Sequence, residues 1–178
     1  MPKSLHISKL DAARRQLETA IRLYFNDCDP VSIHTLTAAS YNIVRDINRS
    51  AGGTKLIIKE QLIERVIPEH QREVRNKLNE AENFFKHADK DPAGVLQFSP
   101  VLTELMIWEA CMAYFQLTGE QLVLARVFNA WFSVRNPHLF RLTEEHERLF
   151  SRSKKEIETV NKQEYFRLYL PVFESIDS

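Results

Sequence analysis

Two rows of polar side chains have the residue types and spacing to form a chemical site. At about 100° per residue of α-helix, each row lies on one face of an expected helix, over residues 30–50 and 69–89. The rows comprise His34, Ala38, Tyr41, Arg45 and Asn48 in the first helix, and Asn76, Glu80, Asn83 and His87 in the second. Such side chains carry protons, exchange hydrogen bonds and bind anions. If both rows face one cleft, they predict a binding site. The alternative is that both are solvated helix faces.

Three further charged residues, Glu104, Glu109 and Arg126, interrupt segments that are otherwise apolar. A carboxylate in such a segment must be paired, hydrogen-bonded or neutralised by a raised pKa. We expect Arg126 to be the partner of these glutamates. A structural ion pair is favoured over a catalytic carboxylate, because no second carboxylate accompanies either one at a defined spacing.

The sequence contains no strong catalytic or metal-binding motif. A glycine-rich phosphate loop, a zinc-ligand spacing, a nucleophile elbow and an HExxH string are all missing. A carboxylate-bridged dinuclear metal site would need Glu-x-x-His pairs, and Glu80 and Glu82 do not stand at that spacing from His87. We therefore expect no catalytic residue, no metal and no cofactor.

The elements that position these residues are expected to be helices. There are only 4 glycines, no Asn-Gly or Asp-Gly hairpin turn, and apolar residues recur with helical spacing. Ser8 and Asp29-Pro30 are typical helix starts. The sequence predicts an all-α, single-domain bundle of six to eight helices over residues 1–178. A buried helical hairpin at about 100–135 is expected at its centre, and a charged helix at about 143–162.

Apolar stripes predict which faces of the two row-bearing helices are buried. The expected core stripe of residues 30–50 lies about 140° from the polar row and contains Ile33, Leu36, Ile43, Val44 and Ile47. That of residues 69–89 contains Val74, Leu78, Ala81, Phe85 and Ala88. The dense apolar tail at 163–178 must also be buried, on its own domain or on a second copy. This tail favours a homo-oligomer.

Charge and cysteine content restrict the cellular setting. The 24 basic and 24 acidic residues cancel, which disfavours nucleic acid and anionic membranes as partners without excluding a local patch. The most apolar window, residues 101–117, is too short for a membrane span and carries Glu104 and Glu109. Two cysteines without metal spacing and the lack of an N-terminal apolar stretch predict a cytoplasmic protein.

Two strings resemble segments of a family of small uncharacterised bacterial helical proteins. They are DPVSIHTL at residues 29–36 and NFFKHADKDP at residues 83–92, and the likeness extends over about residues 5–140. No activity is attached to that family, so the resemblance implies only an all-helical fold. Both strings contain a histidine of the polar rows.

The string Arg75-Asn-Lys-Leu78 is similar to the Arg-Asn-Lys-Leu-x-His stretch of HEPN domains. Many of these compact helical proteins cleave RNA at a composite site built across a dimer. The family's histidine would fall at position 80, where this chain has Glu80, and His87 stands twelve residues from Arg75. The resemblance implies RNA cleavage or binding, and the departure at position 80 removes the expected acid or base.

Three functions follow as hypotheses. The leading one is a non-catalytic helical binding or regulatory module of unknown ligand, homodimeric and cytoplasmic. The alternatives are a HEPN-like RNA-cleaving or RNA-binding protein, and a protein that binds a small molecule in a cleft between the helices over 30–50 and 69–89.

Overall fold

A computed structural model of the chain describes residues 4–89, 91–140, 157 and 159–176. Within these residues the fold is all-α, as predicted: eight α-helices are accompanied by one π-helical and one 3₁₀ turn, and none of the described residues forms a strand. The expected helix over 143–162 lies almost entirely outside the described residues. No described helix has the length and apolar character needed to cross a membrane.

The first two helices form an antiparallel pair whose ends the sequence predicts well. Helix α1 spans Lys9–Phe25, and its cap Ser8 accepts a hydrogen bond from the backbone of Asp11 at 3.0 Å. Helix α2 spans Pro30–Ser50, and the carboxylate of Asp29 accepts from Ser32 N at 2.8 Å. These caps satisfy backbone donors that have no partner within their own helix.

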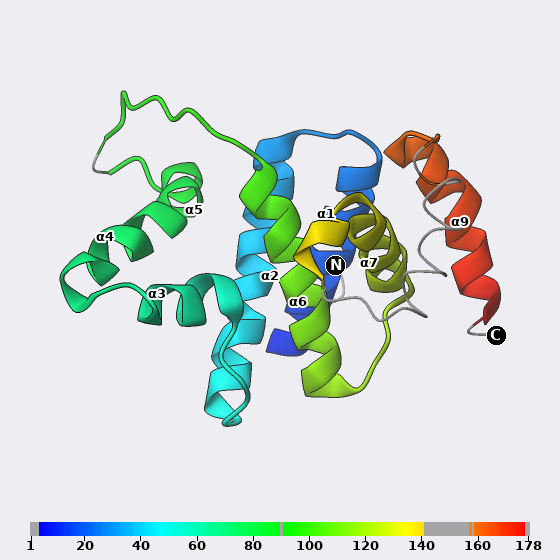
Figure 1. The fold of residues 1–178 in the computed structure, drawn as a ribbon, viewed down its shortest axis with the longest axis horizontal. Helices are drawn as coiled ribbons and strands as arrows, with labels where there is room; N and C mark the ends of the chain where they lie inside the picture. The colour runs from blue at the N-terminus through cyan, green and yellow to red at the C-terminus, as the bar shows by residue number, and fades with distance from the viewer. Residues whose placement is uncertain (1–3, 90, 141–156, 158, 177–178) are drawn as a thin grey trace.

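The predicted hairpin occupies the centre of the fold. Helix α6 (Val101–Thr118) packs against α2, and α7 (Val123–Arg135) follows after a short connection. The last helix, α9 (Lys162–Ile176), lies on the far side of α7 (Figure 1) and places the fully buried Tyr165 among Phe25 and Trp131. Part of the apolar tail is therefore buried within its own chain.

A smaller helical unit projects from the opposite side of the bundle (Figure 1). It comprises the π-helical turn η1 (Ile57–Gln61), α3 (Leu62–Glu64), α4 (Pro68–Leu78) and α5 (Glu80–Lys86). The expectation of one continuous helix over 69–89 is wrong, because the helix breaks at Asn79 and ends at Lys86. No residue of α4 or α5 is buried, so a few specific contacts must hold these two helices in place.

The expected core face of α2 is only partly correct. Ile33 and Val44 are buried, whereas Leu36, Ile43 and Ile47 are half-buried. The face of α2 that is actually buried is rotated around the helix axis, so that it includes residues that were expected to face solvent. Besides Ile33 and Val44, it contains His34, Thr37, Ala38, Ser40, Tyr41 and Asn48. Small side chains let α1 approach closely here, and the hydroxyl of Ser40 donates to the carbonyl of Ala13 at 2.8 Å.

Gly119 ends α6 with a φ of 70°, the left-handed conformation that favours glycine at a helix C-terminus. A Cβ added at this position would meet no atom within 4 Å, so backbone strain alone sets the cost of a side chain. We expect Gly119→Ala to lower the free energy of unfolding by about 1 kcal/mol. Urea unfolding followed by circular dichroism measures this change. Gln121→Ala, in the same connection, is the control and should leave the midpoint unchanged.

Candidate functional site

A carboxylate on the central helix anchors the start of the projecting unit. Glu109 of α6 is 4% exposed and accepts hydrogen bonds from the Tyr41 hydroxyl at 2.7 Å and the backbone N–H of Ile58 at 3.0 Å. The backbone N–H of Ile57 donates to its other oxygen. One side chain thus ties α2 and the π-helical turn to the core. The donors at the start of that turn, which have no partner within it, are thereby satisfied.

Tyr41 is held as a donor in this arrangement. Its ring is fully buried, and burial raises the pKa of its hydroxyl, with the adjacent Glu109 carboxylate raising it further. The protonated hydroxyl donates to Glu109 and can accept from the backbone N–H of Lys59, 3.4 Å away. Tyr41 is therefore a structural link rather than a proton carrier at neutral pH.

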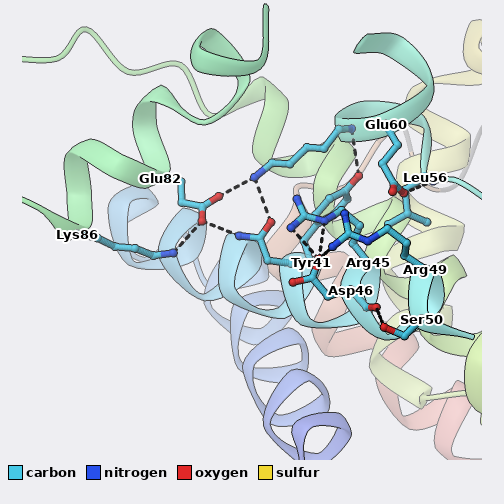
Figure 2. A network of polar contacts seen from close by, with 11 residues as sticks. Tyr41, Arg45, Asp46, Arg49, Ser50, Leu56, Glu60, Glu82 and Lys86 are labelled. Carbon is cyan, nitrogen blue, oxygen red and sulfur yellow. Dashed lines mark hydrogen bonds and ion pairs between the residues drawn. The ribbon is translucent and has the colours of Figure 1, made fainter. Parts of the chain in front are cut away.

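A second polar network holds α5 to α2 and to the π-helical turn. The side chain of Lys59 is 2% exposed and its Nζ donates to Glu82 Oε2 at 2.6 Å and to Asn42 Oδ1 at 3.3 Å. Asn42 Nδ2 donates to Glu82 Oε1 at 2.6 Å. Lys86 also donates to Glu82, at 2.9 Å (Figure 2). Glu82 thus receives hydrogen bonds from three side chains on three elements.

Burial and pairing have opposite effects on this ion pair. Burial lowers the pKa of Lys59, and the hydrogen bond that Lys59 donates to Glu82 opposes that shift. Burial would raise the pKa of Glu82, but hydrogen bonds from Lys59 and Lys86 outweigh it and the net shift is downward. Glu82 is therefore ionised at neutral pH. Its charge compensates a lysine that has almost no contact with water.

Above this network lies a groove of about 620 Å³ between α2 and α4–α5, here named the α2–α4 groove. Its lining comes from every element of the projecting unit and from one face of α2. The residues are Asn42, Arg45, Arg49, Lys55, Lys59, Glu60, Ile63, Glu64, Gln71, Arg75, Asn79, Glu82 and Asn83. A volume of this size is typical of small-molecule sites.

The α2–α4 groove has more positive than negative charge. Five of its described lining residues are cationic and three are acidic. Arg45 and Arg49 both donate to Oδ1 of Asp46, at 2.9 and 3.2 Å (Figure 2). Arg75 has no ion-pair partner among the described residues. Two guanidinium groups thus share one carboxylate and a third has none, which leaves the groove able to bind an anion.

The two predicted rows are divided between three environments. Arg45 and Asn83, one from each row, line the α2–α4 groove. His34 and Tyr41 are buried. Asn76, Glu80 and His87 line a second, more open hollow of about 1310 Å³ along α4 and α5, and Asn83 lines this hollow as well as the groove. The expectation that both complete rows face one cleft is therefore wrong, although a cleft between the two segments does exist.

His34 occupies an aromatic pocket at the junction between the bundle and α5. Its Nδ1 lies 2.8 Å from Thr103 Oγ1, and its ring meets Phe85 and Phe98 edge-on at centroid distances of 5.8 and 5.2 Å. The other ring nitrogen, Nε2, is buried without a hydrogen-bond partner among the described residues. The neutral imidazole is favoured here, because burial, and then the nearby charge of Lys59, lower the pKa of His34.

We expect His34 to make stability depend on pH. Its folded-state pKa lies below the ordinary value of 6.5, so below pH 6.5 the unfolded chain binds a proton that the native state excludes. Stability should fall as the pH decreases through that range. Urea midpoints at pH 7.5 and 5.5 measure the effect, and His34→Gln should reduce the difference between them. The exposed His138 provides the control, since His138→Gln should leave that difference intact. An unchanged difference in His34→Gln contradicts the prediction.

The expected ion pairs of Arg126 are wrong. The carboxylate of Glu109 accepts hydrogen bonds from the Tyr41 hydroxyl and from the backbone N–H groups of residues 57 and 58, not from Arg126. Glu104 is half-buried, and burial raises the pKa of its carboxyl group. Arg126 is also half-buried and lies over the ring of Phe173, with Cζ 5.3 Å from the ring centroid. Of the three residues only Glu109 is fully buried.

Sequence reasoning missed the residues that form the centre of the site. Lys59 directly follows the apolar run Leu56-Ile57-Ile58, but Glu60 and Gln61 come next, so the sequence around it is typical of a helix surface and gives little signal that this lysine is buried. Glu82 stands out in the sequence only as a possible metal ligand, and it lacks the spacing for that role. Asn42 gives no signal of its own, because its two partners stand 17 and 40 residues away in the chain.

No protein-family model, curated protein or solved structure shows significant similarity to this chain.

Proposed function

We propose that this protein is a non-catalytic helical module that binds a small anionic ligand in the α2–α4 groove. The observation that carries the proposal is the excess of cationic over acidic side chains, five against three among the described lining residues, along a groove of ligand size. It combines the leading hypothesis, a binding module, with the alternative of a small-molecule cleft between the segments 30–50 and 69–89.

The chemistry of the lining supports binding rather than catalysis. Its described residues include no histidine, serine or cysteine, the usual nucleophiles and proton carriers. The charged pair at its base, Lys59 and Glu82, is engaged in hydrogen bonds that hold α5 in place. Groups committed to structure in this way can orient a ligand but are poorly placed to exchange protons with it.

No specific observation favours the HEPN-like alternative. Arg75 lines the α2–α4 groove, but Glu80, which stands at the position of the family's histidine, lines the outer hollow and pairs with Lys77 at 2.6 Å. An RNA ligand would also be expected to use stacking on aromatic side chains. None of the described residues that line the groove is aromatic.

The test of the proposal is anion binding by the full chain. Thermal unfolding is followed with phosphate, sulfate or citrate at constant ionic strength, and about 1 kcal/mol of linkage should raise Tm by about 2–4 °C. Arg45→Ala should abolish the shift. Arg72→Ala, an exposed arginine of α4 that lines the outer hollow, should leave it unchanged. The absence of a shift with every anion, or an equal loss in both variants, contradicts the proposal.

We further propose that the protein is a cytoplasmic homodimer. Its two described cysteines, the exposed Cys28 and the buried Cys111, are free, which fits a reducing compartment. On α9, Leu168, Val172 and Ile176 are 48, 50 and 65% exposed at steps of four residues. Such a stripe fits a contact between copies. Light scattering should give twice the chain mass, and Leu168→Lys combined with Val172→Lys should halve it. A monomeric wild-type chain contradicts this part of the proposal.

A further inference from the structure

The proposed function leaves open which class of anion the α2–α4 groove binds. Three properties of its lining restrict the answer: the excess of positive charge, the kinds of hydrogen-bonding group beside it, and the scarcity of apolar side chains. Each can be followed to a feature of the ligand, and this inference rests on the proposed function.

The charge excess favours a doubly charged group. Arg45 and Arg49 share the single carboxylate of Asp46, using the same oxygen, and Arg75, on the α4 side, has no ion-pair partner among the described residues. One guanidinium charge is therefore left on the α2 wall and another on the α4 wall, while Glu60 is a lining carboxylate without an ion-pair partner among the described residues and accepts from the backbone N–H of Leu56. A phosphate monoester carries about −1.5 to −2 charges near pH 7 and has three acceptor oxygens. It can accept from guanidinium groups on both walls, whereas one carboxylate compensates only one of them.

The remaining lining favours hydroxyl groups on the rest of the ligand. Four side-chain amides, Asn42, Gln71, Asn79 and Asn83, stand along the groove. The amide of Asn83 has no assigned partner among the described residues, while Asn42, Gln71 and Asn79 each donate within the protein. The carboxylates of Glu60 and Glu64 add acceptors. Amides and carboxylates can pair with several hydroxyl groups, and the carboxylates disfavour a second anionic group on the ligand.

The scarcity of apolar side chains in the lining disfavours other common phosphorylated ligands. Ile63 is the one aliphatic hydrophobic residue among the described lining residues, and no aromatic ring is present among them. Nucleotide bases usually lie on aromatic or aliphatic surfaces, and a lipid chain requires a continuous apolar wall. The groove offers neither.

We propose that the ligand of the α2–α4 groove is a polyhydroxylated phosphate monoester of small size, such as a sugar phosphate. Its phosphate group binds between the guanidinium groups of Arg45 and Arg75, and its hydroxyl groups pair with Asn83 and the neighbouring polar side chains. The free sugar lacks the charge, and inorganic phosphate lacks the hydroxyl contacts, so each binds more weakly than the ester.

The inference is tested by calorimetric titration of the full chain with glucose 6-phosphate, glucose, inorganic phosphate, succinate and adenosine monophosphate. Glucose 6-phosphate should bind at least about tenfold more tightly than inorganic phosphate, succinate or the nucleotide, and glucose should not bind. Arg75→Gln should weaken glucose 6-phosphate binding by about tenfold or more, as expected for the loss of hydrogen bonds to a charged group. Arg72→Gln on the same helix is the matched control and should bind normally.

The outcomes separate this inference from the proposed function. Tighter binding of succinate or of the nucleotide, with the same dependence on Arg45 and Arg75, overturns the sugar phosphate assignment and leaves an anion-binding module. Equal affinities for inorganic phosphate and glucose 6-phosphate overturn only the proposed hydroxyl contacts and leave the phosphate site in place. If Arg75→Gln and Arg72→Gln bind glucose 6-phosphate alike, the phosphate group does not lie between the two walls and this inference fails. If Arg45→Ala binds anions normally as well, the site is elsewhere and the proposed function fails too. Circular dichroism spectra of both variants should match the wild-type protein, since both side chains are exposed.

Discussion

Glu109→Ala should lower the free energy of unfolding by about 3–5 kcal/mol. The substitution removes the acceptor of Tyr41 and of the backbone donors of Ile57 and Ile58. These donors are buried or half-buried, and water cannot replace the carboxylate without opening the contact between α2, α6 and the π-helical turn. Urea unfolding followed by circular dichroism and tryptophan fluorescence measures the loss.

A graded series distinguishes the hydrogen bonds from the packing of the side chain. Tyr41→Phe removes a single donor and should cost about 1–2 kcal/mol. Glu104→Gln, on the same helix, replaces a half-buried carboxyl group whose pKa is already raised, so its cost should be below about 1 kcal/mol. If Glu109→Ala and Glu104→Gln have the same small effect, Glu109 does not anchor the projecting unit.

The features of this fold that depend only on residues close together in the sequence could be predicted from the sequence. The caps at Ser8 and Asp29, the bounds of α2 and the central position of the α6–α7 hairpin all follow from residues within a few positions of one another. Helix ends are determined by local hydrogen bonds. Burial of α6 follows from its almost continuous apolar sequence.

The buried face of α2 could not be predicted in the same way. Apolar periodicity places His34 and Tyr41 on the solvent side, but each finds a polar partner on α6, Thr103 and Glu109 respectively, 69 and 68 residues away. A buried polar side chain costs little once it is hydrogen-bonded. The hydrophobic pattern cannot show such a partner, and for the same reason it does not show the Lys59–Glu82 pair.

The Lys59–Glu82 ion pair should be the main attachment of α4 and α5 to the rest of the molecule. These helices contain no buried residue, and the Lys59 and Glu82 side chains are only 2 and 11% exposed. Glu82→Leu leaves the ammonium group of Lys59 buried with Asn42 as its remaining partner, and should cost about 3–5 kcal/mol. Lys59→Met should cost less, because Glu82 keeps Lys86 and Asn42. Hydrogen exchange of residues 68–86 should increase in both variants.

The double variant measures the interaction energy between Lys59 and Glu82 separately from their contacts with other residues. Lys59→Met combined with Glu82→Leu leaves no unpaired buried charge at the site, so its cost should fall below the sum of the single costs by about 1–3 kcal/mol. Lys77 and Glu80 provide the matched control, because they form an ion pair of the same 2.6 Å length with side chains 76 and 43% exposed. Lys77→Met should cost less than about 0.5 kcal/mol and leave hydrogen exchange unchanged. Additive costs at Lys59 and Glu82, with no increase in exchange, would show that α4 and α5 are held by the aromatic contacts of Phe85 instead.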